Sequence, residues 1–141
     1  GAQRIIAHVN AFDSEEETKR TLEAWKTTGA KQVYLALVID EPLEAIDPLL
    51  YSCDGVLLMS IATIGRQGIP FDERAYGRVA DLHARYPELS IEVDGGIGET
   101  QIATLARAGA TRFSVGSALS SSQDPAATYQ QLLSLAGSAI Q

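Results

Sequence analysis

The stretch that decides the fold is Ile91-Glu92-Val93-Asp94-Gly95-Gly96-Ile97-Gly98. A short apolar run ends in the carboxylate of Asp94, and two glycines follow before a predicted helix begins at about Glu99. In a parallel α/β protein, this order is typical of a strand that carries an acid to the functional edge of the sheet. Gly95 and Gly96 would let backbone N–H groups approach an anion near the start of the helix.

A smaller version of this pattern follows about one strand–helix unit later, at Phe113-Ser114-Val115-Gly116-Ser117. A single Gly-Gly pair is as easily an ordinary turn between a strand and a helix. Two glycine turns in consecutive units are more specific, because parallel strands bring their carboxyl ends to the same edge of a sheet. Together the two stretches predict a phosphate-binding site with an acid beside it.

Composition places the chain among globular proteins. Its 141 residues are 45% hydrophobic and 21% charged, enough for one domain but short for a closed eight-stranded barrel of about 250 residues. The net charge of −7 argues against a nucleic-acid surface, although it still permits an anionic substrate. Cys53 is the only cysteine, so no intramolecular disulfide forms and a cytoplasmic location is expected. No apolar run approaches the roughly 20 residues of a membrane span, so no membrane partner is predicted.

A short repeat marks the beginning of three predicted strands. In each copy a glycine that would end a helix is followed by polar residues and then by a buried strand. The copies are Gly1-Ala2-Gln3-Arg4, Gly29-Ala30-Lys31-Gln32 and Gly109-Ala110-Thr111-Arg112. A helix precedes each internal copy but not the first, which predicts that the chain is a fragment beginning where an earlier helix ended.

Five strand–helix units are predicted. The strands are expected at about residues 4–9, 32–39, 55–59, 91–94 and 112–115. Ser14 and Glu17 form a predicted capping box, and Asp124-Pro125 is predicted to cap the last helix. The predicted core face of that last helix comprises Tyr129, Leu132, Leu133 and Ala136.

Alternating strands and helices require a parallel sheet with right-handed crossovers. Two architectures accept five such units. One is a self-contained flavodoxin-like open parallel sheet, and the other is the last five units of a (β/α)8 barrel. The absence of a helix before Gly1 favours the barrel.

At the level of motifs, the chain resembles the C-terminal part of the ribulose-phosphate 3-epimerase family, across nearly its whole length. The matching motifs, in order, are His8-Val9-Asn10-Ala11, Pro42-Leu43-Glu44, Leu57-Leu58-Met59-Ser60, Glu92 to Ile97, Val115-Gly116-Ser117-Ala118 and Asp124-Pro125. The resemblance implies a TIM (β/α)8 barrel of the ribulose-phosphate-binding type. Residues 1–141 would then be a partial barrel domain that contains strands four to eight and lacks the three N-terminal βα units.

The resemblance also implies a reaction, the exchange of D-ribulose 5-phosphate and D-xylulose 5-phosphate by proton transfer at C3. It assigns Asp94 as one of two acid/base residues and as a ligand of a divalent metal ion (Zn, Fe, Mn or Co). The second acid and the other ligands would lie on strands outside this chain. The substrate phosphate would be held by Gly95, Gly96, Gly116 and Ser117, and the substrate lined by His8, Met59, Gly65 and Gln67. The intact protein is expected to be a homo-oligomer.

One loop departs from the family pattern. After the Met-Ser step the family usually reads Asn-Pro-Gly-Phe-Gly-Gly-Gln, whereas this chain has Ala62-Thr63-Ile64-Gly65-Arg66-Gln67-Gly68. Gly65 and Gln67 align only with a one-residue gap. Arg66 adds a cation that would either contact phosphate or lie in solvent, and solvent is the favoured interpretation. The altered loop keeps one alternative open, a decarboxylase or lyase acting on another sugar phosphate. A second alternative is a non-catalytic or regulatory phosphate-binding module with a flavodoxin-like fold. Made alone, the chain is expected to be weakly stable, self-associating and inactive.

Overall fold

The computed structural model describes residues 1–66 and 68–139. Its described residues form one parallel sheet with the order β1-β2-β3-β4-β5. The strands are β1 (Arg4–His8), β2 (Gln32–Leu37), β3 (Gly55–Met59), β4 (Ser90–Asp94) and β5 (Arg112–Ser114). Each strand therefore lies beside its neighbours in sequence. A flavodoxin-like sheet reverses its order at a switch point, so that alternative is wrong, and winding in one direction is the arrangement of a (β/α)8 barrel.

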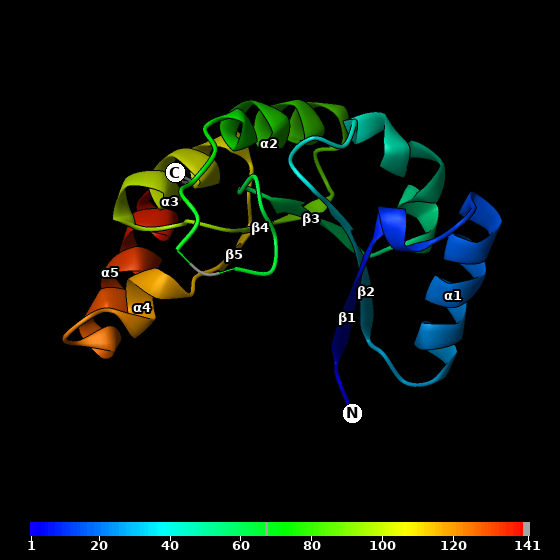
Figure 1. Ribbon diagram of the computed structural model, residues 1–141, viewed down its shortest axis with the longest axis horizontal. Coiled ribbons are helices and arrows are strands. Elements are labelled where there is room, and N and C mark those ends of the chain that lie inside the picture. The colour runs from blue at the N-terminus through cyan, green and yellow to red at the C-terminus, as the bar shows by residue number, and fades with distance from the viewer. Residues whose placement is uncertain (67, 140–141) are drawn as a thin grey trace.

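Helices cover the outside of the curved sheet (Figure 1). The α-helices are α1 (Glu15–Thr27), α2 (Arg74–Arg85), α3 (Glu99–Ala108), α4 (Ser117–Ser120) and α5 (Pro125–Ser138). Two 3-10 helices, η1 (Val9–Ala11) and η2 (Leu43–Ser52), complete the connections. The arc of strands stays open on one side, with β1 and β5 as its edge strands (Figure 1).

The predicted helix starts are present. The Asp124 carboxylate accepts a hydrogen bond from Ala127 N at 3.0 Å, as a cap should. The Ser14 hydroxyl accepts from Glu17 N at 3.2 Å. The reciprocal half of the predicted capping box differs, because the Glu17 carboxylate accepts from Asp13 N at 3.0 Å.

The main core lies between the sheet and the helices α2 and α3. Every residue of β3 is buried, which explains why its sequence is apolar without alternation. Val79 and Leu82 of α2 and Leu105 of α3 are fully buried against Ile91 and Val93 of β4. This packing fixes the direction of β4 and therefore the position of Asp94 at its carboxyl end.

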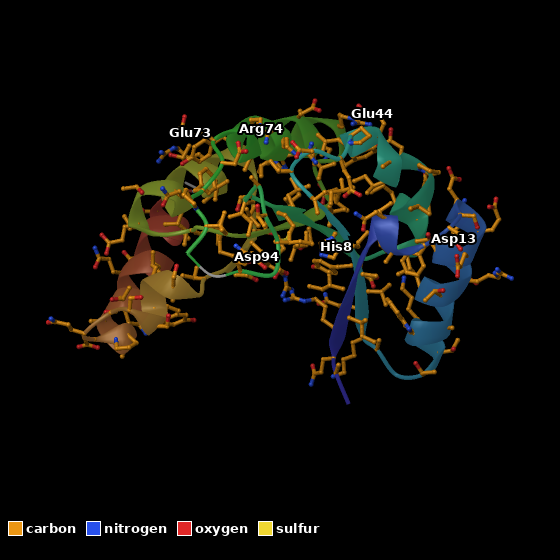
Figure 2. The ribbon with its side chains drawn as sticks, viewed as in Figure 1. His8, Asp13, Glu44, Glu73, Arg74 and Asp94 are labelled. Atoms are coloured by element: carbon orange, nitrogen blue, oxygen red, sulfur yellow. The ribbon has the colours of Figure 1, made fainter. Side chains whose placement is uncertain are left out.

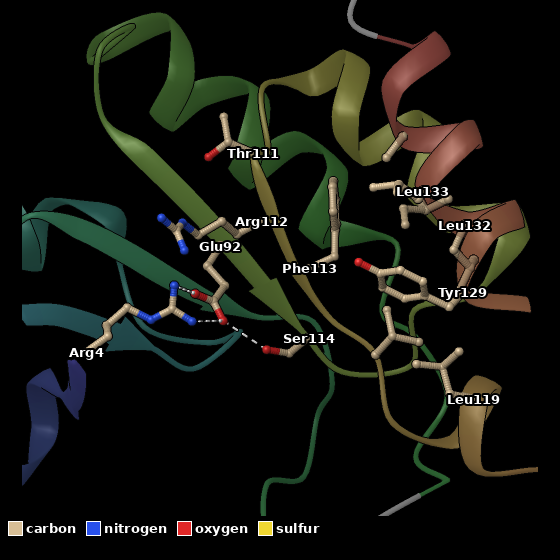
Figure 3. A pocket seen from close by; sticks show the side chains of 13 residues that line it. Arg4, Glu92, Thr111, Arg112, Phe113, Ser114, Leu119, Tyr129, Leu132 and Leu133 are labelled. Atoms are coloured by element: carbon tan, nitrogen blue, oxygen red, sulfur yellow. Dashed lines mark hydrogen bonds and ion pairs between the residues drawn. The ribbon is translucent and has the colours of Figure 1, made fainter. Parts of the chain in front are cut away.

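The predicted core face of α5 is wrong in part. Leu132 is buried, but the side chains of Tyr129 and Leu133 are 52% and 55% exposed. They flank a cavity of about 410 Å³ along β5, whose outer edge pairs with no described strand (Figure 3). At the other end of the arc, Ile6 on the edge strand β1 is 38% exposed. Large apolar side chains thus remain uncovered at both open edges of the sheet.

Among the described residues, no helix has the length and apolar character needed to cross a bilayer.

Candidate active site

Asp94 ends β4 and lies beside Met59 of β3 and Ser114 of β5 in the strand register. A cavity of about 320 Å³ opens at this carboxyl end of the sheet. The residues that line it include most of the predicted set: Asp94, Gly95, Gly96, Gly116, Ser117, Met59 and Gly65. Asp94 and the two glycine turns therefore share one cavity, as parallel strand ends should.

Asp94 sits in an environment suited to proton transfer. Burial raises the pKa of the Asp94 carboxyl above its ordinary value, and the negative charge of Glu92 on the same strand raises it further. A carboxyl with a raised pKa holds its proton closer to neutral pH, which favours general acid–base chemistry.

Glu92, which lies beside the site and not in its lining, is a residue whose influence on Asp94 sequence reasoning missed. Its side chain is buried, and it shares the inner face of β4 with Asp94 because alternate residues of a strand point the same way. An Arg4 Nη1–Glu92 Oε2 ion pair of 3.0 Å crosses from β1 to β4 (Figure 3). Ser114 Oγ donates to Glu92 Oε1 at 2.9 Å. A carboxylate in the middle of an otherwise apolar run, two residues before Asp94, was the available signal.

Ser60 fixes the turn that follows Asp94. It is fully buried, and its backbone N–H donates to the Asp94 carbonyl at 2.8 Å. Its hydroxyl lies 3.0 Å from the Asp94 carbonyl and 2.7 Å from that of Gly95, so its proton can serve either oxygen. The loop after β3 is thereby anchored to the end of β4.

The glycines of the two turns have different structural explanations. Gly95 has φ +121°, and a Cβ there would lie 2.6 Å from a side-chain carbon of Ile61. Gly96 has φ +63°, and its Cβ would lie 2.7 Å from the backbone N of Phe71. Gly116 has φ −104°, and no described atom other than those of its chain neighbours lies within 4 Å of its Cβ position. Neither strain nor protein packing explains a glycine at residue 116, whereas the close approach of a ligand would.

The structure does not place two of the predicted lining residues at this cavity. His8 ends β1 but does not line the Asp94 cavity, and its Nδ1 is buried without a hydrogen-bond partner among the described residues (Figure 2). Gln67 lies outside the described residues.

The described residues do not make a metal site by themselves. No group of three or more His, Cys, Asp or Glu side chains suited to a metal ion occurs among them. Glu92, the nearest acid along the strand, is already paired with Arg4. A divalent cation needs more ligands than Asp94 alone can offer.

Comparison with solved structures supports the fold. The chain matches 3-hexulose-6-phosphate synthase from Salmonella typhimurium with a TM-score of 0.75 and 19% identity, covering 99% of this chain and 64% of that one. It matches orotidine 5'-monophosphate decarboxylase from Sulfolobus solfataricus with a TM-score of 0.68 and 14% identity, again over 99% and 64%. At these identities the likeness concerns the fold alone.

Sequence comparison gives the family. Ribulose-phosphate 3-epimerase of Aquifex aeolicus is 38% identical over 147 residues, covering 99% of this chain and 63% of the relative. The Schizosaccharomyces pombe enzyme is 32% identical over 126 residues, covering 89% and 53%. The chain thus spans between half and two thirds of the length of these relatives. The model of the ribulose-phosphate 3 epimerase family matches residues 1–120, so the chain belongs to that family.

Proposed function

We propose that this chain forms part of an enzyme that interconverts D-ribulose 5-phosphate and D-xylulose 5-phosphate. The observation that carries the proposal is a single cavity shared by a partly buried carboxyl with a raised pKa, Asp94, and the glycine turn at Gly116. Membership of the family supports the choice of reaction. The cavity volume of about 320 Å³ falls in the size range of small-molecule sites.

In this mechanism Asp94 transfers one proton at C3. Removal of that proton, next to the C2 ketone, leaves an enediolate, and return of a proton to the opposite face inverts the configuration. The second acid/base group must come from outside the described residues, because Glu92 is engaged by Arg4 and Ser114. The predicted divalent metal likewise requires ligands beyond Asp94, and we derive no step through it. The isolated chain is therefore expected to be inactive.

The phosphate of the substrate would bind at the two glycine turns. Backbone N–H groups of Gly95, Gly96 and Gly116 and the hydroxyl of Ser117 are the proposed donors. The open space in front of Gly116 supports this placement, since a side chain there would occupy the position of a ligand oxygen.

We propose that the chain supplies five units of an eight-unit barrel, with three further βα units completing the circle between β5 and β1. Unpaired strand edges are rarely left uncovered, and both edges here carry exposed apolar side chains: Ile6, Tyr129 and Leu133. The cavity beside β5 is where a further strand would pair (Figure 3). A homo-oligomeric state and a cytoplasmic location for the complete protein stay predictions.

The test uses the complete natural protein that contains this chain. Solvent deuterium should enter C3 of ribulose 5-phosphate, followed by NMR, as the two sugars interconvert. Asp94→Asn should slow this exchange by about 10²-fold or more, because the amide cannot accept the proton. Asp81→Asn, on the exposed face of α2, is the matched control and should exchange at the wild-type rate. Unchanged exchange in Asp94→Asn would refute the assignment.

Neither alternative from the sequence is favoured by a specific observation. The structural neighbours that would support a decarboxylase or lyase are only 14% and 19% identical to this chain. At such identities the similarity concerns the fold alone. The non-catalytic module drew on a flavodoxin-like sheet, which the strand order excludes.

A further inference from the structure

Arg66 lines the same cavity as Asp94 and the glycine turns. The sequence favoured a position in solvent, and the side chain is indeed exposed, but it stands at the mouth of the candidate site. Among the described residues that line this cavity, Arg66 is the only cationic side chain and Asp94 is the only carboxylate.

The guanidinium of Arg66 has no carboxylate partner among the described residues. Arg4, Arg74 and Arg85 each form an ion pair with a carboxylate, whereas Arg66 forms none with any described residue. The chain carries a net charge of −7, and the cavity already holds Asp94. An anion entering there is repelled unless a local cation compensates, and Arg66 is placed to do so.

The loop that carries Arg66 is anchored at both ends beside Asp94. At one end Ile61 packs on Gly95 and the buried Ser60 binds the carbonyls of Asp94 and Gly95. At the other end Asp72 N donates to the Ser60 carbonyl at 2.8 Å. Between these anchors Gly65 and Gly68 have φ values of +81° and +75°, and both line the cavity. Gly65 therefore turns the backbone directly before Arg66, in a loop whose two anchors lie beside Asp94.

We propose that Arg66 binds the phosphate group of the substrate and so selects phosphorylated over unphosphorylated sugars. This inference deepens the proposed function and rests on it for the identity of the sugar. A guanidinium presents two parallel N–H donors to two phosphate oxygens, which a lysine ammonium does not. The glycine turns offer directional hydrogen bonds, and Arg66 adds the countercharge that those neutral groups lack.

The test is a set of dissociation constants measured by calorimetry on the complete natural protein that contains this chain. The probes are inorganic phosphate, ribulose 5-phosphate and ribulose. Arg66→Gln should weaken both phosphorylated probes on the order of tenfold or more and leave ribulose unchanged. The affinity of Arg66→Lys for the phosphorylated probes should lie between those of the wild type and Arg66→Gln. Lysine keeps the positive charge but lacks the two parallel N–H donors of the guanidinium. Arg20→Gln on the exposed surface of α1 removes the same charge and should change affinity less than about twofold.

The proposal would be overturned by wild-type phosphate affinity in Arg66→Gln, by an equal loss in Arg20→Gln, or by no phosphate binding in the wild-type protein. Equal weakening of ribulose would also overturn it, since Arg66 would then contact the sugar. Circular dichroism and urea midpoints matching the wild type show that each variant is folded. These readouts are independent of turnover. If phosphate binding depends on Arg66 but the protein does not exchange the proton at C3, the epimerase assignment is wrong. The role of Arg66 in phosphate binding would still stand.

Discussion

The phenol ring of Tyr34 on β2 occupies the space that a Cβ atom on Gly55 of β3 would need. Such an atom would lie 2.5 Å from Tyr34 Cζ and 2.7 Å from the carbonyl oxygen of Ser90. Tyr34 is fully buried, and its hydroxyl donates to Ser90 Oγ at 2.8 Å. Three neighbouring strands therefore meet at a position that only glycine can fill.

Gly55→Ala should lower the free energy of unfolding by about 1–3 kcal/mol, because a well-packed core resists an added methyl group. Gly77→Ala is the matched control: Gly77 lies inside α2, where no described atom apart from the local helix backbone comes within 4 Å of its Cβ position. That change should raise stability by about 0.5–1 kcal/mol through helix propensity. Urea unfolding measures both, and equal shifts would contradict the packing argument.

Glu92→Gln should destabilise the fold by about 2 kcal/mol, because Arg4 then keeps its charge in a largely buried site without a counterion. Glu88→Gln, at an exposed position between α2 and β4, should change stability by less than about 0.5 kcal/mol. A double variant, Arg4→Met with Glu92→Leu, should lose less than the sum of its two single changes. Strict additivity would mean that the Arg4–Glu92 contact carries no coupling energy.

Asp94→Asn should make the protein more resistant to urea at pH 7. Burial and Glu92 raise the pKa of Asp94 in the folded state, so the folded state binds more protons than the unfolded state between the ordinary and the raised value. The contribution of the Asp94 carboxyl to the stability of the wild-type protein is therefore present at low pH and is lost as the pH rises through that window. The advantage of the variant should therefore shrink as the pH falls below the ordinary carboxyl range. An advantage that is constant with pH would exclude this cause.

Cys53 should react slowly with thiol reagents while the protein is folded. The residue is buried, burial raises the pKa of its thiol, and Sγ donates to the Leu50 carbonyl at 3.6 Å. Labelling at neutral pH should be on the order of a hundredfold slower than in urea, because the thiolate is the reactive form and must first be exposed. Glutathione under the same conditions controls for the reagent. Equal rates in buffer and urea would show that this part of the sheet opens freely.

Tyr129→Ser combined with Leu133→Ser should reduce self-association of the 141-residue chain, because these side chains flank the free edge of β5. Tyr51→Ser is the control, since Tyr51 is fully exposed on η2 and does not line this cavity. Sedimentation velocity at several concentrations distinguishes the three proteins. A wild-type chain that stays monomeric, or an equal effect of Tyr51→Ser, would contradict the role assigned to the β5 edge.

The sequence predicted the elements more readily than their partners. The strand ending at Asp94 was predictable because an apolar run, an acid and two glycines are local signals. Its pairing with Arg4 was not, because Arg4 and Glu92 are 88 residues apart and only the curvature of the sheet brings them together. The parallel topology made it possible to predict that Asp94 and Gly116 lie together. The position of Arg66 could not be predicted in this way, because it depends on how its loop is anchored.

The core face of α5 also shows that a local sequence pattern does not reveal the tertiary contacts of a helix. Tyr129, Leu132 and Leu133 have the spacing of a buried stripe, which the helix period reveals. Whether a stripe is buried depends on what lies against it: Leu132 is in the core and Ala136 packs against that core, whereas Tyr129 and Leu133 are about half exposed. Periodicity predicts which face is apolar and cannot predict how much of that face is covered.

The strand order carries a consequence for biosynthesis. Because each strand pairs with the one made just before it, the sheet can grow one unit at a time as the chain leaves the ribosome, without waiting for distant segments. The Arg4–Glu92 ion pair and the Tyr34–Ser90 hydrogen bond join strands that are not neighbours, so both must wait for β4 to be synthesised. Until then Arg4 has no carboxylate partner on β4, so this ion pair should form only after four of the five strands have been made.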